Sequence, residues 1–390
     1  MAKLGECFSV IRNGASIRQT DGAGGFPITR IETIADKTIN REKFGYAEIY
    51  DLAQYRDYIL QDGDILMSHI NSEKHLGKVA LYSKQGDEQI IHGMNLLMLR
   101  ADTQKVIPEY AKYYFESQKF LRQIGRITKK SVNQASFTVT ALKELEIPLA
   151  SIIVQRDISE KLKKVDWLVS LREQQLAKLD ELVKARFVEM FGDGQVFNKE
   201  LLSQNVEEMF IGPFGSSLKN ENFVSKENGY CMVYEQKHAI RKTMDVETRY
   251  IDKPKYEELK RFSIHGGDII VSCRGTIGET YIVPLNAPLG IMHPSIMKIR
   301  VKDSIYNRVF FDFLLQEKLK QHETQANGSG VKMAVTASAL GKEEFIVPSI
   351  LFQNQFAAFV ERVDQQKQTV QQSLEKLELM KKALMQEYFG

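Results

Sequence analysis

The chain repeats itself once at a spacing of about 200 residues, and this repeat constrains its fold more than any other feature. Residues 63–68 (GDILMS) match residues 267–272 (GDIIVS), and residues 189–192 (EMFG) match residues 387–390 (EYFG). Two further matches, residues 95–100 with 295–300 and residues 146–155 with 346–355, fall between them in the same order. The period is far too long for a solenoid repeat, so the pattern predicts a duplicated domain whose surface loops differ in length.

Each copy mixes strand and helix signals in the α+β manner. Pro108 suits the first turn of a helix that would carry Tyr110, Tyr113, Tyr114 and Leu121, and residues 309–321 form its counterpart. Short apolar or alternating runs between Gly, Pro and Asn residues predict strands. These runs cover residues 28–34, 64–68, 78–82 and 95–100 in the first copy, and 231–234, 268–273, 280–283 and 295–301 in the second.

Each copy then ends in a long helix. Neither Gly nor Pro interrupts residues 155–191 or 355–389, and apolar residues recur there in alternating steps of four and three. Such stripes favour a coiled coil, and an antiparallel pair would hold two similar globular domains apart with pseudo-two-fold symmetry. The predicted seam contains Leu162, Val165, Val169, Leu176, Leu179, Val183, Val363, Val370, Leu374, Leu377 and Leu384, with Arg172, Arg186, Lys367 and Lys381 as polar interruptions.

These patterns predict four segments. Residues 1–150 and 195–350 form the two globular domains, and residues 151–194 and 351–390 form the two spacer helices.

Composition and motifs exclude several classes of protein. The three cysteines, Cys7, Cys231 and Cys273, lack CxxC spacing, which argues for a reducing compartment without disulfides or a zinc knuckle. No run approaches the ~20 apolar residues that span a bilayer. We find no phosphate-binding loop, no HExxH and no Asn-Pro-Pro-aromatic motif, so no catalytic or metal residues are predicted. The net charge of +3 leaves nucleic-acid binding open, because a basic patch matters more than the total.

Basic and amide side chains gather in two loops of each copy, beside predicted strands. Lys, Arg and Ser suit phosphate contacts, while Arg, Asn and Gln can address base edges. The alternative is that these loops are ordinary solvated hairpin tips. The candidate DNA-binding residues are Lys74, His75, Lys78, Lys129, Lys130, Ser131, Asn133, Gln134, Arg274, Thr276 and Lys332.

The whole layout resembles a specificity subunit of a Type I restriction-modification system. The resemblance rests on the duplication, on Ile147-Pro148 with Gln155 and Val347-Pro348 with Gln355 leading into the long helices, and on residues 275–278 (GTIG). The first copy departs from it, with residues 72–77 (SEKHLG) at the equivalent tip.

The resemblance implies two target recognition domains that read an asymmetric, bipartite site on double-stranded DNA in the cytoplasm. It also implies docking of two methyltransferase subunits, and of restriction or motor subunits, on the long helices. The chain itself would be non-catalytic and hold no cofactor, and the partners would hold S-adenosylmethionine, ATP and Mg²⁺. Two alternatives remain at this point: a coiled-coil scaffold without DNA specificity, and a DNA-modifying enzyme with an unfamiliar site.

Overall fold

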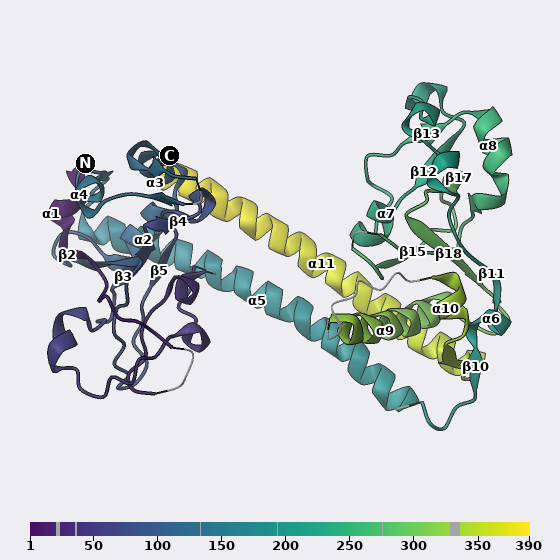
Figure 1. The fold of residues 1–390 in the computed structure, drawn as a ribbon, viewed down its shortest axis with the longest axis horizontal. Coiled ribbons are helices and arrows are strands. Elements are labelled where there is room, and N and C mark those ends of the chain that lie inside the picture. Colours follow the sequence, from purple (N-terminus) through teal and green to yellow (C-terminus); the bar gives the residue numbers. More distant parts are fainter. Residues whose placement is uncertain (21–23, 36, 133, 193, 275, 328–335) are drawn as a thin grey trace. The chain divides into compact units, whose positions relative to one another are not determined.

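The computed structural model describes residues 1–390 except 21–23, 36, 133, 193, 275 and 328–335, and it describes no side chains for residues 322–327. The chain divides into two compact units (Figure 1). Unit 1 comprises Met1–Gln175 and Val370–Gly390, and unit 2 comprises Leu176–Thr369.

Each unit is built around a four-stranded antiparallel sheet, and the strand order is the same in both. The orders are β2-β6-β3-β5 in unit 1 and β11-β18-β15-β16 in unit 2. The first strand pair carries a bulge at the same place in both sheets. The predicted duplication is therefore present in the backbone. The strands are β2 Phe8–Asn13, β3 Ile65–Ser68, β5 Val79–Leu81 and β6 Leu96–Ala101, then β11 Val206–Ile211, β15 Ile269–Ser272, β16 Thr280–Ile282 and β18 Ile296–Val301.

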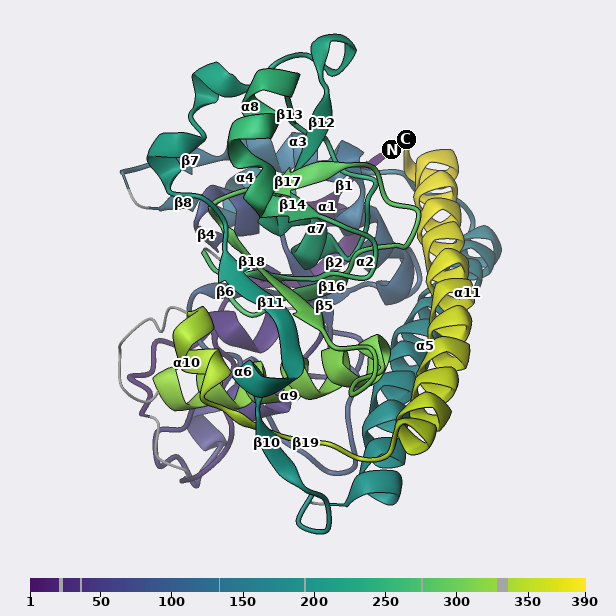
Figure 2. The same ribbon diagram turned by 90° about the vertical axis from the view of Figure 1, so that its right-hand side faces the viewer.

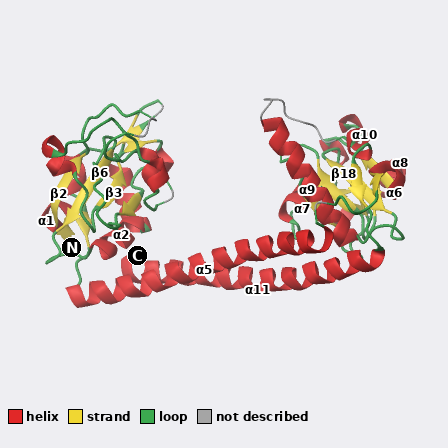
Figure 3. Cartoon of the chain, turned by 90° about the horizontal axis from the view of Figure 1, so that it is seen from below, coloured by secondary structure: helices red, strands yellow, loops and turns green. Residues whose placement is uncertain are grey.

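Shorter elements surround these sheets (Figures 1 and 3). Unit 1 adds β1 Ala2–Lys3 paired with β9 Glu146–Ile147, the sheet β4 Ile70–Asn71, β8 Ala135–Ser136 and β7 Lys129–Lys130, and the helices α1 Leu4–Cys7, α2 Pro108–Glu116, α3 Gln118–Ile127 and α4 Val139–Lys143. Unit 2 adds β10 Lys199–Leu201 paired with β19 Glu344–Ile346, the sheet β13 Tyr250–Ile251, β12 Cys231–Tyr234, β17 Gly290–Met292 and β14 Ser263–Ile264, and the helices α6 Leu202–Asn205, α7 Gln236–Arg241, α8 Lys253–Leu259, α9 Arg308–Asn327 and α10 Ala337–Gly341.

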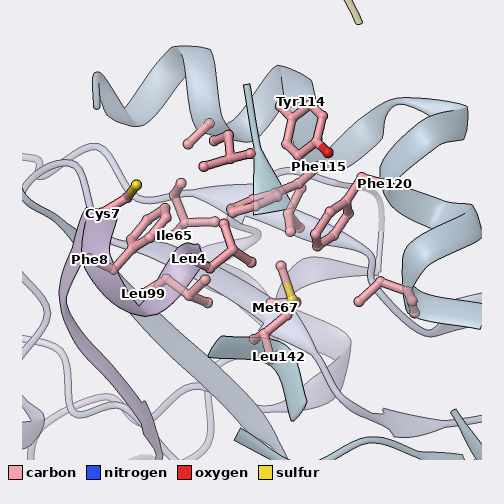
Figure 4. Close-up of a cluster of buried hydrophobic side chains, with 14 of the residues drawn as sticks. Leu4, Cys7, Phe8, Ile65, Met67, Leu99, Tyr114, Phe115, Phe120 and Leu142 are labelled. Carbon is pink, nitrogen blue, oxygen red and sulfur yellow. The ribbon is translucent and has the colours of Figure 1, made fainter. Parts of the chain in front are cut away.

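The central strands β3 and β6 of the unit 1 sheet are buried on both faces, which explains why each carries a continuous apolar run. Ile65, Met67 and Leu99 pack on one face with Phe115 and Phe120 from α2 and α3, as Figure 4 shows. Residues of alternate parity, among them Leu66, Met98 and Tyr82, form a second cluster. The aromatic layer supplied by α2 and α3 is tight, with the rings of Phe115 and Phe120 centred 4.6 Å apart.

The two long helices, α5 Ile152–Phe191 and α11 Ile350–Phe389, are 40 residues each and pack against each other in an antiparallel manner within both units (Figure 3). In unit 1 Asp166 pairs with Lys381, and in unit 2 Asp180 pairs with Lys367 at 2.6 Å. Two of the predicted polar interruptions, Lys367 and Lys381, thus find partners across the seam, whereas Arg186 pairs with Glu189 of its own helix. Of the predicted seam residues, Leu162, Val165, Leu179, Val183, Val363, Val370 and Leu374 are buried, and Val169, Leu176, Leu377 and Leu384 are partly buried.

A buried glutamine fixes the first turn of each long helix. Gln155 accepts a hydrogen bond from the Ile107 amide at 2.9 Å and donates two, to the carbonyls of Lys105 and Ala150. Gln353 makes the same three bonds in unit 2, with the Asn307 amide and the Ile305 and Pro348 carbonyls. The sequence match of Gln155 to Gln355 is therefore wrong by two residues, and Gln355 is exposed.

The far end of each long helix is held by a phenylalanine. Phe389 at the end of α11 packs its ring 5.3 Å from Tyr110 in unit 1. Phe191 at the end of α5 packs 5.0 Å from Phe310 in unit 2. The repeated motif found at residues 189–192 and 387–390 is thus an anchor in the aromatic layer of a sheet domain.

Two expected elements differ in the structure. The predicted strand over residues 28–34 makes only isolated bridges at Ile28 and then a 3-10 turn at Ile31–Ile34, because the Thr33 hydroxyl accepts from the Arg30 amide and turns the chain. The single helix predicted from Pro108 is two helices, because the Ser117 hydroxyl accepts from the Phe120 amide and starts α3 as an N-cap.

Candidate nucleic-acid interface

The two candidate loops of unit 1 join in one small sheet (Figure 2). Strand β4 pairs with β8, and β8 pairs with β7, so the loop after β3 lies beside the loop after α3. An ion pair of 2.7 Å between Glu73 and Lys130 links them further. Strands of two residues carry no periodicity, which is why sequence patterns located both loops but not their contact.

The candidate side chains on this surface differ in their availability. Lys74, Lys129 and Gln134 are exposed, whereas the Lys78 ammonium donates to the Ala35 carbonyl at 3.1 Å. Ser131 donates its hydroxyl back to Gln134 across the hairpin tip. Asn133 lies outside the described residues.

His75 is protonated less readily than a free histidine. Desolvation, together with the charges of Lys78 and Lys74, holds the pKa of His75 below its usual value. The neutral ring can donate or accept a hydrogen bond, so it suits a base edge or a phosphate oxygen without adding positive charge.

Amide side chains border a hollow of about 490 Å³ beside β4. Asn71 at the end of β4 lines its rim, Gln134 reaches it from the second loop, and Asn95 adopts a left-handed φ of 74° in the turn before β6. Such side chains can pair bidentately with adenine edges. Asn95 was missed from the sequence, although Asn is the side chain that best tolerates this conformation.

The hairpin of unit 2 repeats the frame of the first with a different tip. Gly77 and Gly278 both have positive φ, and each donates its amide at 2.9 Å to the serine that ends the preceding strand, Ser68 or Ser272. The tip between these residues is three residues shorter in unit 2, which accounts for most of the drift in repeat spacing. Arg274 and Thr276 are exposed on this tip. Lys332 lies outside the described residues.

Two histidines near the candidate loops of unit 1, His69 and His92, are buried. Burial lowers the pKa of His69 to about 4 and that of His92 to about 3, so both are neutral under ordinary conditions. Across the described ranges, no three His, Cys, Asp or Glu side chains lie together as a metal site would require.

No helix in the described part of the chain combines the length and the apolar character needed to cross a membrane.

Comparisons with known proteins agree on one family. The model of the Type I restriction modification DNA specificity domain matches residues 1–181 and 214–379. A putative type I restriction enzyme MjaX specificity subunit from Methanocaldococcus jannaschii is 30% identical over 393 residues, covering 98% of this chain and 91% of its own.

Solved structures show the same fold at low identity. The Type-I restriction-modification S subunit from M. genitalium aligns with a TM-score of 0.58 at 14% identity, covering 100% of this chain and 95% of its own. A chain from a study of complex assembly and conformational transition in the type I R-M system aligns with a TM-score of 0.59 at 15% identity, covering 100% and 96%.

Proposed function

Because this chain belongs to the Type I restriction modification DNA specificity family, we propose that it reads a bipartite, asymmetric DNA site, one half with each unit. Membership makes it a DNA-recognition protein rather than a catalytic one, and the mixed fold with two similar domains and paired long helices agrees with the expectation from sequence. The scaffold and enzyme alternatives are therefore set aside.

The proposal rests on the finding that the two units contain hairpins that are closed in the same way but have different tips. Gly77 and Gly278 close equivalent hairpins, yet the first tip is longer and joins the β7–β8 hairpin, while the second presents Arg274 and Thr276. Like frames with unlike tips suit two different half-sites. The proposed DNA contacts are Lys74, His75, Lys78, Lys129, Lys130, Ser131, Asn133, Gln134, Arg274, Thr276 and Lys332.

The long helices would carry the methyltransferase subunits. Their first turns expose apolar side chains beside the glutamine anchor in both units: Ile153 and Val154 in α5, and Leu351 and Phe352 in α11. Equivalent exposed apolar patches suit two copies of one partner. We place S-adenosylmethionine, ATP and Mg²⁺ in the methyltransferase and motor subunits, and the complex in the cytoplasm with the DNA.

The test is to map methylated sites in a host that carries this gene with its neighbours, for the wild type and two variants. Lys74→Ala with Gln134→Ala alters unit 1 alone, and Arg274→Ala with Thr276→Ala alters unit 2 alone. Each variant should relax or lose one half of the site and leave the other intact. A single contiguous site, or variants that change both halves together, would refute the proposal.

A further inference from the structure

Unit 1 contains a long segment without a single acidic residue. Residues 117–143 hold six Lys or Arg side chains and no Asp or Glu, so this segment alone carries +6 in a chain whose total is +3. An ordinary solvated surface intersperses both signs of charge. The segment comprises α3, the β7–β8 hairpin and α4.

The exposed face of α3 presents these charges in line. Phe120 and Ile124 are buried beneath the helix, which leaves Arg122 and Arg126, one turn apart, exposed to solvent. Lys129 follows directly in β7. We call these three exposed cations the α3 track.

The cations of the α3 track have no carboxylate partner among the described residues. The Arg122 guanidinium donates only to the Gln118 carbonyl of its own helix, and neither Arg126 nor Lys129 has an ion-pair partner in the described ranges. Glu146 lines a hollow of about 370 Å³ together with Arg122 and Arg126, but forms no ion pair with either. The track therefore presents uncompensated positive charge.

Unit 2 differs at the corresponding helix. In α9, Lys318 pairs with Glu343 at 3.0 Å, and Lys320 pairs with Glu317 at 2.9 Å. The described lysines Lys318 and Lys320 of α9 are thus electrostatically compensated, whereas the cations of the α3 track are not.

We propose that the α3 track binds DNA phosphates independently of sequence and makes unit 1 the main electrostatic anchor of the chain. The inference rests on the proposed function and adds a division of labour between the units. A helix of ten residues is about 15 Å long, which spans about four phosphates of one strand at 3.4 Å each. A guanidinium group suits this role because it can bind two phosphate oxygens at once.

The experiment measures binding of the full chain to a labelled duplex that lacks the recognition site, as a function of salt. Each phosphate contact contributes a slope of about −0.9 in log K against log salt. Arg122→Gln with Arg126→Gln should therefore flatten the slope by about 1.8. Between 50 and 200 mM salt, the wild type should lose affinity about 12-fold more than this variant.

The matched control is Lys318→Gln with Lys320→Gln, which removes two cations from the equivalent helix of unit 2 but should leave the slope nearly unchanged. Gln has a helix propensity similar to those of Arg and Lys, so the helices should persist, and circular dichroism checks this. An equal change of slope in both variants overturns the division between units, and an unchanged slope in the α3 variant overturns the track itself.

A further arm measures capture of the methyltransferase subunit. Loss of capture with an unchanged DNA slope would show that the track binds protein, and would refute the proposal. Because binding to this probe does not require half-site recognition, these outcomes are distinguishable from failure of the proposed function. Failure of half-site reading in the methylation maps would refute the proposed function instead.

Discussion

The sheet of unit 2 contains a buried lysine paired with a partly exposed glutamate, where unit 1 has apolar residues, and this difference makes a sharp prediction. Lys298 is 1% exposed, and its ammonium donates to Glu208 at 2.6 Å and to the Ser263 carbonyl at 3.0 Å. The strand registers place Met98 and Val10 at the equivalent positions of unit 1. Unit 1 therefore shows that a sheet of this fold accepts Met and Val at these two positions.

The two single variants should behave very differently. Glu208→Val leaves a buried ammonium without its carboxylate, which typically costs 3–5 kcal/mol. We expect about 3 kcal/mol, because Lys298 keeps the Ser263 carbonyl and the ring of Phe210 at 4.7 Å. Lys298→Met leaves Glu208, whose side chain is 38% exposed, free to use water and Arg300 at 3.0 Å. That change should fall within about 1 kcal/mol of neutral, and the double variant should match or exceed the wild type.

Thermal unfolding of the full chain measures these changes. For a unit of this size, a loss of 3 kcal/mol lowers Tm by about 6–12 °C. Met98→Lys is the matched control, since it should bury an unpaired ammonium in unit 1 with a similar loss, which adding Val10→Glu should partly restore. Equal losses for Glu208→Val and Lys298→Met would refute the reasoning, because they would show that the charge pair itself stabilises the sheet.

Three further predictions concern the anchors, the buried histidines and the long helices. Gln155→Ala should lower the free energy of unfolding by about 3 kcal/mol, because it leaves three backbone groups without their hydrogen-bond partner. Gln355→Ala should change Tm by no more than the error of the measurement. Equal effects of the two variants would contradict the assignment of Gln155 as the anchor. Burial lowers the pKa of folded His92 to about 3, whereas its pKa in the unfolded chain is about 6.5. Its contribution to stability is therefore complete above pH 6.5 and is lost as the pH falls towards about 3. Between pH 7 and pH 5, Tm should fall more steeply in the wild type than in His92→Asn, and parallel curves would exclude this cause. Inserting seven residues into each long helix, after residue 175 and before residue 370, adds about 10 Å and should widen the gap between methylated half-sites by about three base pairs; an unaltered gap would show that the helices do not set it.

The duplication, the long helices and the central strands could be predicted from the sequence, because the patterns that indicate them are repeated or periodic. The α5 and α11 stripes extend over 40 residues each, so a few polar interruptions such as Arg172 could not hide them. Arg172 in fact donates to Ser373 across the seam at 3.2 Å. Strands such as β3 and β15 were found because the same apolar run occurs twice at the same place in the order.

What escaped prediction depends on contacts between residues far apart in the chain. The two-residue strands β4 and β8 pair across more than 60 residues, and nothing local to either indicates that pairing. The equivalence of Gln155 and Gln353 is defined by three hydrogen bonds rather than by neighbouring letters, so alignment on the Ile-Pro and Val-Pro pairs displaced it by two residues. The break at Ser117 is a side-chain bond that competes with helical periodicity.

Comparison of the two copies also distinguishes the residues that maintain the sheet and its hairpin from those that can vary on the surface. Ser68 with Gly77 and Ser272 with Gly278 hold the same hairpin geometry around tips of different length, and loop-closure entropy changes little for three extra residues. The tips can therefore change in length and charge while the sheets beneath them keep their register. The α3 track fits the same division, because its cations project from a helix whose buried side, Phe120 and Ile124, belongs to the frame. Under the proposed function, new half-site specificity would require changes only in the tips and exposed side chains, outside the buried cluster.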